Sequence, residues 1–173
     1  MIIGSGDVAS VLPKRNKKMF FASGVSNSLE TRESEFQREK NLLLRQNRKA
    51  HLVYFSSLAV LHGDNRYVRH KREMEKLIKQ EFPLYTIMRL GNITWGTNPH
   101  TIINFFRARI KKGLPLKIQN TYRYIIDKDE FLHWINLIPN WPCEMNCPGR
   151  RMSIQEIVDE FCLIGQRPNR NAS

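Results

Sequence analysis

The chain has 173 residues, of which 28 are Lys or Arg, 16 are Asp or Glu and 41% are apolar, a composition typical of one globular domain. Its net charge of +12 favours anionic partners: nucleic acid, an acidic membrane surface or a phosphorylated small molecule. No apolar run approaches the roughly 20 residues that cross a bilayer, and the first residues lack the pattern of a secretory signal. We therefore expect a cytoplasmic protein without a membrane partner.

The cysteines predict reduced thiols. Cys143, Cys147 and Cys162 are odd in number and lack the spacing of a disulfide framework. The five histidines are scattered singly, so no second ligand pair accompanies Cys143 and Cys147. We expect no metal site.

Short strand patterns alternate with longer helical ones along the chain, which is typical of βαβ units. Strands are expected at residues 1–3, 19–22, 52–55 and 85–90. The last two are nearly continuous apolar runs, as expected of parallel strands covered on both faces.

Helices are expected between these strands and after them. The first runs from about residue 27 to 47, where Asn27 and Glu30 resemble a capping pair and Leu29, Phe36 and Leu43 recur at heptad spacing. Further helices are expected at residues 67–80 and 102–110, after Asp127 with Glu130, and after Ser153 with Glu156.

These patterns predict the α/β class: a reduced Rossmann-type domain with a mostly parallel sheet, helices on both faces and a small C-terminal extension. We expect a dinucleotide-binding core at residues 1–96 and an abbreviated substrate-side segment at 97–165. Residues 166–173 are expected to form a frayed tail.

The glycine turn at the start of the chain is the first candidate binding site, because ligands of open parallel sheets bind beyond the carboxyl ends of the strands. Gly4, Ser5 and Gly6 fit G-x-G-x-x-A, in which glycines let a pyrophosphate approach backbone N–H groups at a helix N-terminus. A plain glycine turn is the alternative, since the strand is short and Pro13 would end the helix early.

Tyr67 and Lys71 are the second candidate, because side chains four residues apart share one helical face. A phenol has a pKa of about 10, and a nearby ammonium favours its phenolate, so the pair could move a hydroxyl proton during hydride transfer. The alternative is a pair of solvated side chains at a helix start. A second copy, Tyr124 with Lys128, spans a strand and a helix cap and should not present both side chains together.

Five blocks in this order resemble the extended short-chain dehydrogenase/reductase superfamily, in particular its NAD-dependent sugar-nucleotide epimerase/dehydratase branch. They are VYFSSLAVLHG, YVRHKREMEKLI, YTIMRLGNITWG, YRYIIDKDEF and MSIQEIVDEF. The resemblance covers about residues 18–163.

The resemblance implies three catalytic roles. Tyr67 would be the acid–base, Lys71 would lower its pKa and hold the nicotinamide ribose, and Ser57 would hydrogen-bond the reacting hydroxyl. Sliding the block by one residue would put Leu58 in place of Ser57. Leu58 and Ala59 stand where dehydratases carry two carboxylates, which argues against dehydration.

The resemblance also implies the ligands. The cofactor would be NAD or NADP, held by Gly4, Ser5, Gly6, Ser23, Gly24, Lys71 and Leu90. The substrate would be a nucleotide-linked sugar, with Asn92 and Arg123 near its diphosphate. A homodimer through the helix that carries Tyr67 and the helix before it is a further implication.

The chain departs from that pattern on the adenosine side. No carboxylate lies between Asp7 and Glu30 to hold the adenosine ribose, and the usual second and third strands are missing. Instead, residues 14–18 carry four cations, which either hold a 2′-phosphate and so favour NADP or form a solvated basic loop.

We therefore expect an NAD(P)-dependent epimerase or reductase acting on a nucleotide-linked sugar, an isomerase or an oxidoreductase by class. The competing hypothesis is a catalytically inactive Rossmann scaffold that binds an anionic partner such as nucleic acid. Basic clusters support it, but they are dispersed along the chain, and no helix-turn-helix, zinc finger or aromatic RNA-binding motif is present.

Overall fold

The computed structural model describes residues 1–14 and 17–163. The middle of the basic run at 14–18 and the tail at 166–173, which we expected to fray, therefore lie outside the described residues. The strands are β1 (Ile2–Ile3), β2 (Met19–Phe21), β3 (Leu52–Ser57), β4 (Tyr85–Leu90), β5 (Asn92–Ile93), β6 (Tyr122–Ile126), β7 (Cys143–Cys147) and β8 (Arg150–Ser153). The helices are α1 (Asp7–Val11), α2 (Glu33–Leu44), the 3₁₀ turn η1 (Leu58–Leu61), α3 (Arg66–Glu81), α4 (Ile102–Lys111), α5 (Lys128–Asn136) and α6 (Ile154–Phe161).

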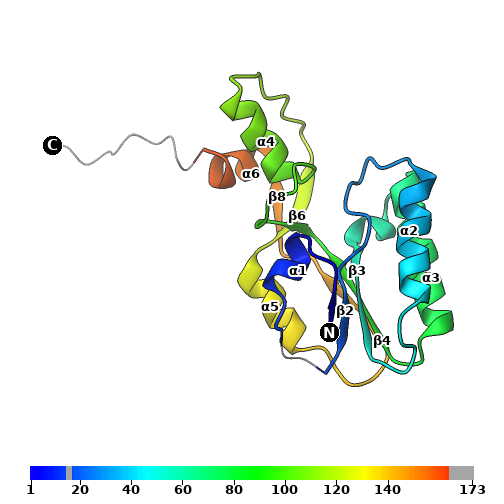
Figure 1. The fold of residues 1–173 in the computed structure, drawn as a ribbon. Coiled ribbons are helices and arrows are strands. Elements are labelled where there is room, and N and C mark those ends of the chain that lie inside the picture. The colour runs from blue at the N-terminus through cyan, green and yellow to red at the C-terminus, as the bar shows by residue number, and fades with distance from the viewer. Residues whose placement is uncertain (15–16, 164–173) are drawn as a thin grey trace.

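A five-stranded sheet in the order β1-β2-β3-β4-β7 forms the body of the molecule, and every neighbouring pair in it is parallel. Figure 1 shows α1 and α5 on one face and α2 and α3 on the other. The predicted α/β class and mostly parallel sheet are confirmed.

Alternation along the strands divides the core between the two faces. Phe20, Val53 and Phe55 pack with α5 on one side, whereas Phe21 and Tyr54 pack with α2 and α3 on the other. Because both faces are covered, the strands are apolar at successive positions.

A second, three-stranded sheet in the order β5-β6-β8 lies beyond the carboxyl edge of the first (Figure 1). One face of it packs against α4 and α6 through Ile103, Phe106, Ile125, Met152 and Ile157. We call residues 97–126 and 150–161 the small unit. No helix among the described residues is long and apolar enough to span a membrane.

The start of α2 differs from the prediction. The helix begins at Glu33 rather than near Asn27, and Leu29, expected on its buried face, is 81% exposed. The Glu30 carboxylate accepts hydrogen bonds from the backbone N–H groups of Thr31 and Arg32, which stabilises an irregular turn in place of a helical one. The capping pattern was therefore wrong here.

The other two capping predictions are confirmed. Asp127 accepts a hydrogen bond from the N–H of Glu130, and Ser153 and Glu156 form a reciprocal capping box. Strands β7 and β8 were not predicted, because CEMNC and RRMS have no strong apolar alternation. β7 belongs to the segment assigned to the substrate side, yet it completes the large sheet beside β4.

Candidate functional site

The predicted cofactor residues lie along one edge of the large sheet. Gly4 follows β1, Ser23 and Gly24 follow β2, and Ser57 ends β3 opposite Leu90 at the end of β4. Because these strands are parallel and in register, their carboxyl ends meet at the same edge. The fold therefore brings together turns that are far apart in the sequence.

Tyr67 lies at the head of α3, buried against Val25, Phe36 and Val68. The helix starts at Asn65, whose side chain accepts a hydrogen bond from the N–H of Val68. One turn further, the Lys71 ammonium lies 5.8 Å from the centroid of the Tyr67 ring. The two side chains thus share one helical face, as their spacing predicts.

Lys71 is not solvated but belongs to a buried polar cluster. Its Nζ donates to Glu39 Oε1 at 3.1 Å and to the Tyr54 hydroxyl at 3.0 Å. Glu39 is fully buried and also accepts hydrogen bonds from the Tyr54 hydroxyl and the N–H of Val25, and its Oε2 lies 3.0 Å from His70 Nε2. We call Glu39, Tyr54, His70 and Lys71 the Glu39 cluster.

The Glu39 cluster changes the acidity of its members. Burial raises the pKa of a carboxyl group, but the Lys71 charge and the hydrogen bonds from His70, Tyr54 and Val25 hold the pKa of Glu39 well below its usual range. Burial and the neighbouring carboxylate raise the pKa of Tyr54 well above its usual value. Glu39 is therefore an ion at neutral pH and Tyr54 a neutral phenol.

Gly24 contacts this cluster. A Cβ at Gly24 would lie 2.7 Å from Lys71 Nζ and 2.8 Å from Glu39 Oε1. The absence of a side chain therefore makes room for the Lys71–Glu39 ion pair. Sequence reasoning missed Glu39, because a single carboxylate on an amphipathic helix looks like a solvated charge.

Ser57 caps the turn that follows β3. Its Oγ accepts a hydrogen bond from the N–H of Ala59 at 3.2 Å, while Ser56 Oγ donates to the buried Glu75 at 2.6 Å. Leu58, the alternative at the hydroxyl position, is buried at the start of η1. Ser57 is therefore the hydroxyl residue at the end of β3, and its Oγ has already accepted one hydrogen bond.

The glycine turn combines a close backbone contact with an open position. Gly4 has φ +113°, and a Cβ there would overlap the carbonyl of Ala22. A Cβ on Gly6 would meet nothing within 4 Å. In the short helix that follows, Asp7 accepts hydrogen bonds from the N–H groups of Thr97 and Asn98, each at 3.0 Å, which ties the loop after β5 to the turn.

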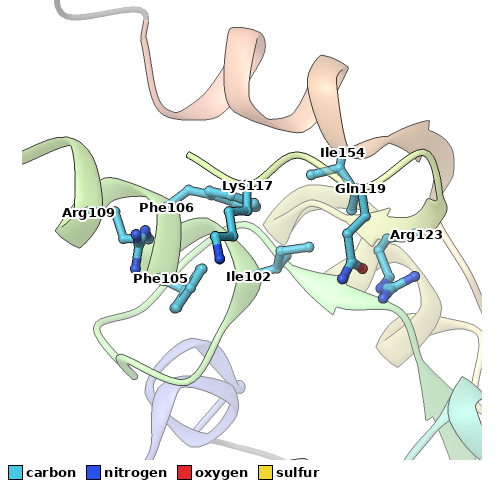
Figure 2. A pocket seen from close by; sticks show the side chains of 8 residues that line it. All are labelled: Ile102, Phe105, Phe106, Arg109, Lys117, Gln119, Arg123 and Ile154. Atoms are coloured by element: carbon cyan, nitrogen blue, oxygen red, sulfur yellow. The ribbon is translucent and has the colours of Figure 1, made fainter. Parts of the chain in front are cut away.

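A pocket of about 410 Å³ lies in the small unit, between α4 and the start of β6. Figure 2 shows the side chains that line it: Ile102, Phe105, Phe106, Arg109, Lys117, Gln119, Arg123 and Ile154. Arg123 is a predicted substrate residue, whereas Asn92 is absent from the lining and donates its side-chain amide to the carbonyl of Tyr124.

The pocket combines three cations, Arg109, Lys117 and Arg123, with three apolar side chains of α4. Arg109 donates to the carbonyl of Pro115, and Arg123 donates to the carbonyl of Tyr122. Among the described residues no carboxylate forms an ion pair with Arg109, Lys117 or Arg123. One feature of this pocket is visible in the sequence: the spacing of Ile102, Phe105, Phe106 and Arg109 places them on one helix face. The other lining residues come from the loop before β6, from β6 and from α6, and the sequence does not show that they meet α4.

The thiols carry no comparable chemistry. Burial raises the pKa of Cys147 to about 12, so its thiol stays protonated at neutral pH. Cys143 and Cys162 are free thiols. The described residues contain no cluster of three His, Cys, Asp or Glu side chains suited to a metal ion.

Neither the protein-family models nor the curated protein sequences contain a match to this chain. Solved structures do match. The Bordetella bronchiseptica enzyme WbmH in complex with NAD+ superposes with a TM-score of 0.69 at 12% identity, over 88% of this chain and 60% of that one. This chain therefore shares the Rossmann-type fold of an NAD-bound enzyme.

Two further structures agree. WbmG from Bordetella bronchiseptica, in complex with NAD and UDP, matches with a TM-score of 0.61 at 16% identity, over 83% of this chain and 55% of that one. The UDP-glucose 4-epimerase of Thermus thermophilus, in complex with NAD, gives 0.60 at 15% identity, over 83% and 60%. The chain thus spans little more than half the length of these enzymes, and the predicted resemblance is confirmed in fold.

Proposed function

We propose that this protein binds a nucleotide-linked sugar and acts on it as an NAD(P)-dependent epimerase or reductase. The pocket beside α4 supports this proposal most directly, because it combines an apolar wall with three cations that form no ion pair with a carboxylate in the described part of the chain. Arginine forks match the oxygens of a diphosphate, and aromatic rings such as Phe105 offer a flat surface for a base.

The residues at the sheet edge fit the nicotinamide half of a dinucleotide better than the adenosine half. Gly6 leaves open space beside the turn, and Ser57, Tyr67 and Leu90 lie along the same edge. On the adenosine side β1 is the edge strand, and no described strand lies beyond it. The cofactor, when bound, would take or give the hydride, and NAD and NADP both remain candidates.

Tyr67 would exchange the proton of the reacting hydroxyl, with Ser57 orienting that hydroxyl. Lys71 Nζ donates to Glu39 and Tyr54 and lies 5.8 Å from the centroid of the Tyr67 ring, so it makes no hydrogen bond to Tyr67 among the described residues. Glu39 and Tyr54 take two of the three N–H donors of Lys71, so a contact with a nicotinamide ribose would use the third. Dehydration is not part of the proposal, because Leu58 and Ala59 supply no carboxylate.

The test is calorimetric titration of the purified protein with UDP, with NAD(H) and with NADP(H). We expect saturable binding of UDP and of one dinucleotide, and loss of turnover without loss of UDP binding in Tyr67→Phe. Failure to bind any dinucleotide at millimolar concentration would exclude an NAD(P)-dependent enzyme. The UDP titration would still show whether the protein binds a nucleotide.

One observation favours a second candidate, an inactive scaffold that binds anionic ligands. The Glu39 cluster already satisfies Lys71, which would leave the family's lysine without a catalytic task. In that case UDP would bind, both dinucleotides would fail to bind, and Lys71→Met would change stability alone.

The homodimer implied by the resemblance would use the outer faces of α2 and α3. Exposed positions on α3 include Arg69, Arg72, Glu73 and Lys76, so such an interface would be polar. Light scattering during size exclusion, at low and high salt, would measure the oligomeric state.

A further inference from the structure

The β6–β8 pair has two faces of different chemistry. Tyr122 pairs with Ser153 and Tyr124 with Arg151, so these four side chains share one face. Arg123 and Ile125 alternate with the tyrosines and face α4, α6 and the pocket. The tyrosine face is therefore distinct from the face that lines the proposed nucleotide site.

The tyrosine face is exposed and aromatic. Tyr122 is 49% exposed and Tyr124 41%, and the Arg151 guanidinium stacks 3.6 Å from the centroid of the Tyr122 ring. Two residues apart on a strand, the rings are spaced roughly 7 Å along it. We call Tyr122, Tyr124 and Arg151 the stacking face.

The chain around this face is one-sided in charge. In the sequence, the segment between Glu81 and Asp127 that contains β6 has seven Lys or Arg residues and no Asp or Glu. Three of these cations, Arg109, Lys117 and Arg123, line the pocket on the opposite face, and Arg89 forms ion pairs in the sheet body. Arg151 itself has no carboxylate partner among the described residues, and its contact is the Tyr122 ring. A partner with many negative charges would complement such a surface, whereas a second copy of the chain would repel it.

We propose that the stacking face binds single-stranded nucleic acid. Unpaired bases stack on exposed aromatic rings of a sheet and on arginine planes, while phosphates approach the surrounding cations. A duplex would hide its base faces from Tyr122 and Tyr124. This inference does not depend on the proposed enzyme function, because it uses the opposite face of β6.

The experiment measures fluorescence anisotropy of a labelled ten-nucleotide oligo(dT) and oligo(rU) with the full chain at two salt concentrations. We expect saturable binding that weakens with salt, and about tenfold weaker binding in Tyr122→Ala and in Tyr124→Ala. Tyr122→Phe keeps the ring and should stay within about twofold of the wild type. Arg151→Gln should weaken binding and reduce the salt dependence.

The controls separate this surface from others. Trp141→Ala removes an aromatic side chain that is 66% exposed elsewhere, and it should leave binding unchanged. The circular dichroism spectrum and the urea midpoint of Tyr122→Ala should match those of the wild type, which shows that the variant folds. The proposal is overturned if no oligonucleotide binds or if both alanine variants bind oligonucleotides as the wild type does. It is also overturned if a duplex or anionic lipid vesicles bind as tightly as the single strands and the tyrosine substitutions do not change that binding.

Discussion

The sheet body and the small unit use their basic side chains differently. Among the described residues of the body, at least nine Lys and Arg side chains form ion pairs, from the buried Lys71–Glu39 pair to Arg89, which contacts both Glu75 and Glu144. In the described small unit only Arg150 pairs with a carboxylate, that of Glu160. Many cations of the body are therefore neutralised by carboxylates, whereas most cations of the described small unit are not.

Breaking the buried Lys71–Glu39 ion pair of the body should have the largest effect on stability. Glu39→Gln should lower the free energy of unfolding by about 3–5 kcal/mol, because it leaves the Lys71 ammonium buried without its counterion. Urea denaturation followed by circular dichroism measures this. Glu33→Gln, on the same helix but in an exposed pair with Arg66, should cost below about 1 kcal/mol.

A double variant sharpens this result. Glu39→Gln combined with Lys71→Met removes both charges and should cost less than the sum of the two single changes. Costs that add would mean that the two charges do not interact.

Stability should also depend on pH through Glu39. Because its pKa is lowered in the folded state, the folded protein resists protonation, and the stabilisation is complete above the unfolded pKa of about 4.3. It is lost progressively as the pH falls below that value toward the folded pKa. Urea midpoints at pH 7, 5, 4 and 3 measure the loss, and a flat profile would contradict the cluster.

Arg123→Gln should produce the reverse pattern to Glu39→Gln. We expect the dissociation constant for UDP to rise by about tenfold or more, because a charge-assisted hydrogen bond is lost. The free energy of unfolding should stay within about 0.5 kcal/mol of the wild-type value. Lys40→Gln, an exposed cation on α2, is the matched control and should alter neither quantity. Loss of stability in Arg123→Gln would show that the small unit also uses its cations structurally.

The smallest effect is expected from the capping box of α6. Ser153→Ala removes the acceptor for the N–H of Glu156 and should cost about 1 kcal/mol. Thermal unfolding measures the change, and Ser153→Asp, which keeps an N-cap acceptor, should restore most of it. An unchanged melting temperature in Ser153→Ala would show that the helix end needs no cap.

Local signals predicted the elements whose residues carry their own pattern. The strand at 85–90 was predicted to the residue, and the caps at Asp127 and Ser153 formed, because each depends on side chains within four positions. The predicted start of α2 was wrong although its capping pattern is also local, because the Glu30 carboxylate accepts hydrogen bonds from the N–H groups of Thr31 and Arg32 instead of capping a helix. β7 has too little apolar alternation to be recognised.

The candidate site was predictable only where it follows strand ends. The glycine turns lie at the carboxyl ends of β1 and β2, where a parallel sheet places them, and Tyr67 and Lys71 share one face of α3 as their spacing predicts. The Glu39 cluster and the pocket could not be predicted in this way, because each joins side chains from separate elements. Glu39 contacts Tyr54 and Lys71 only after α2 and α3 pack on the sheet. Arg109 and Arg123 line the same pocket only because α4 covers β6.

Titration of UDP into the wild type and Arg123→Gln at low and moderate salt tests the central claim, that the small unit keeps its cations for an anionic ligand. We expect one saturable site in the wild type, with an affinity that is weakened by salt and by the substitution. Absence of binding up to millimolar UDP, or equal affinity in both proteins, would contradict it.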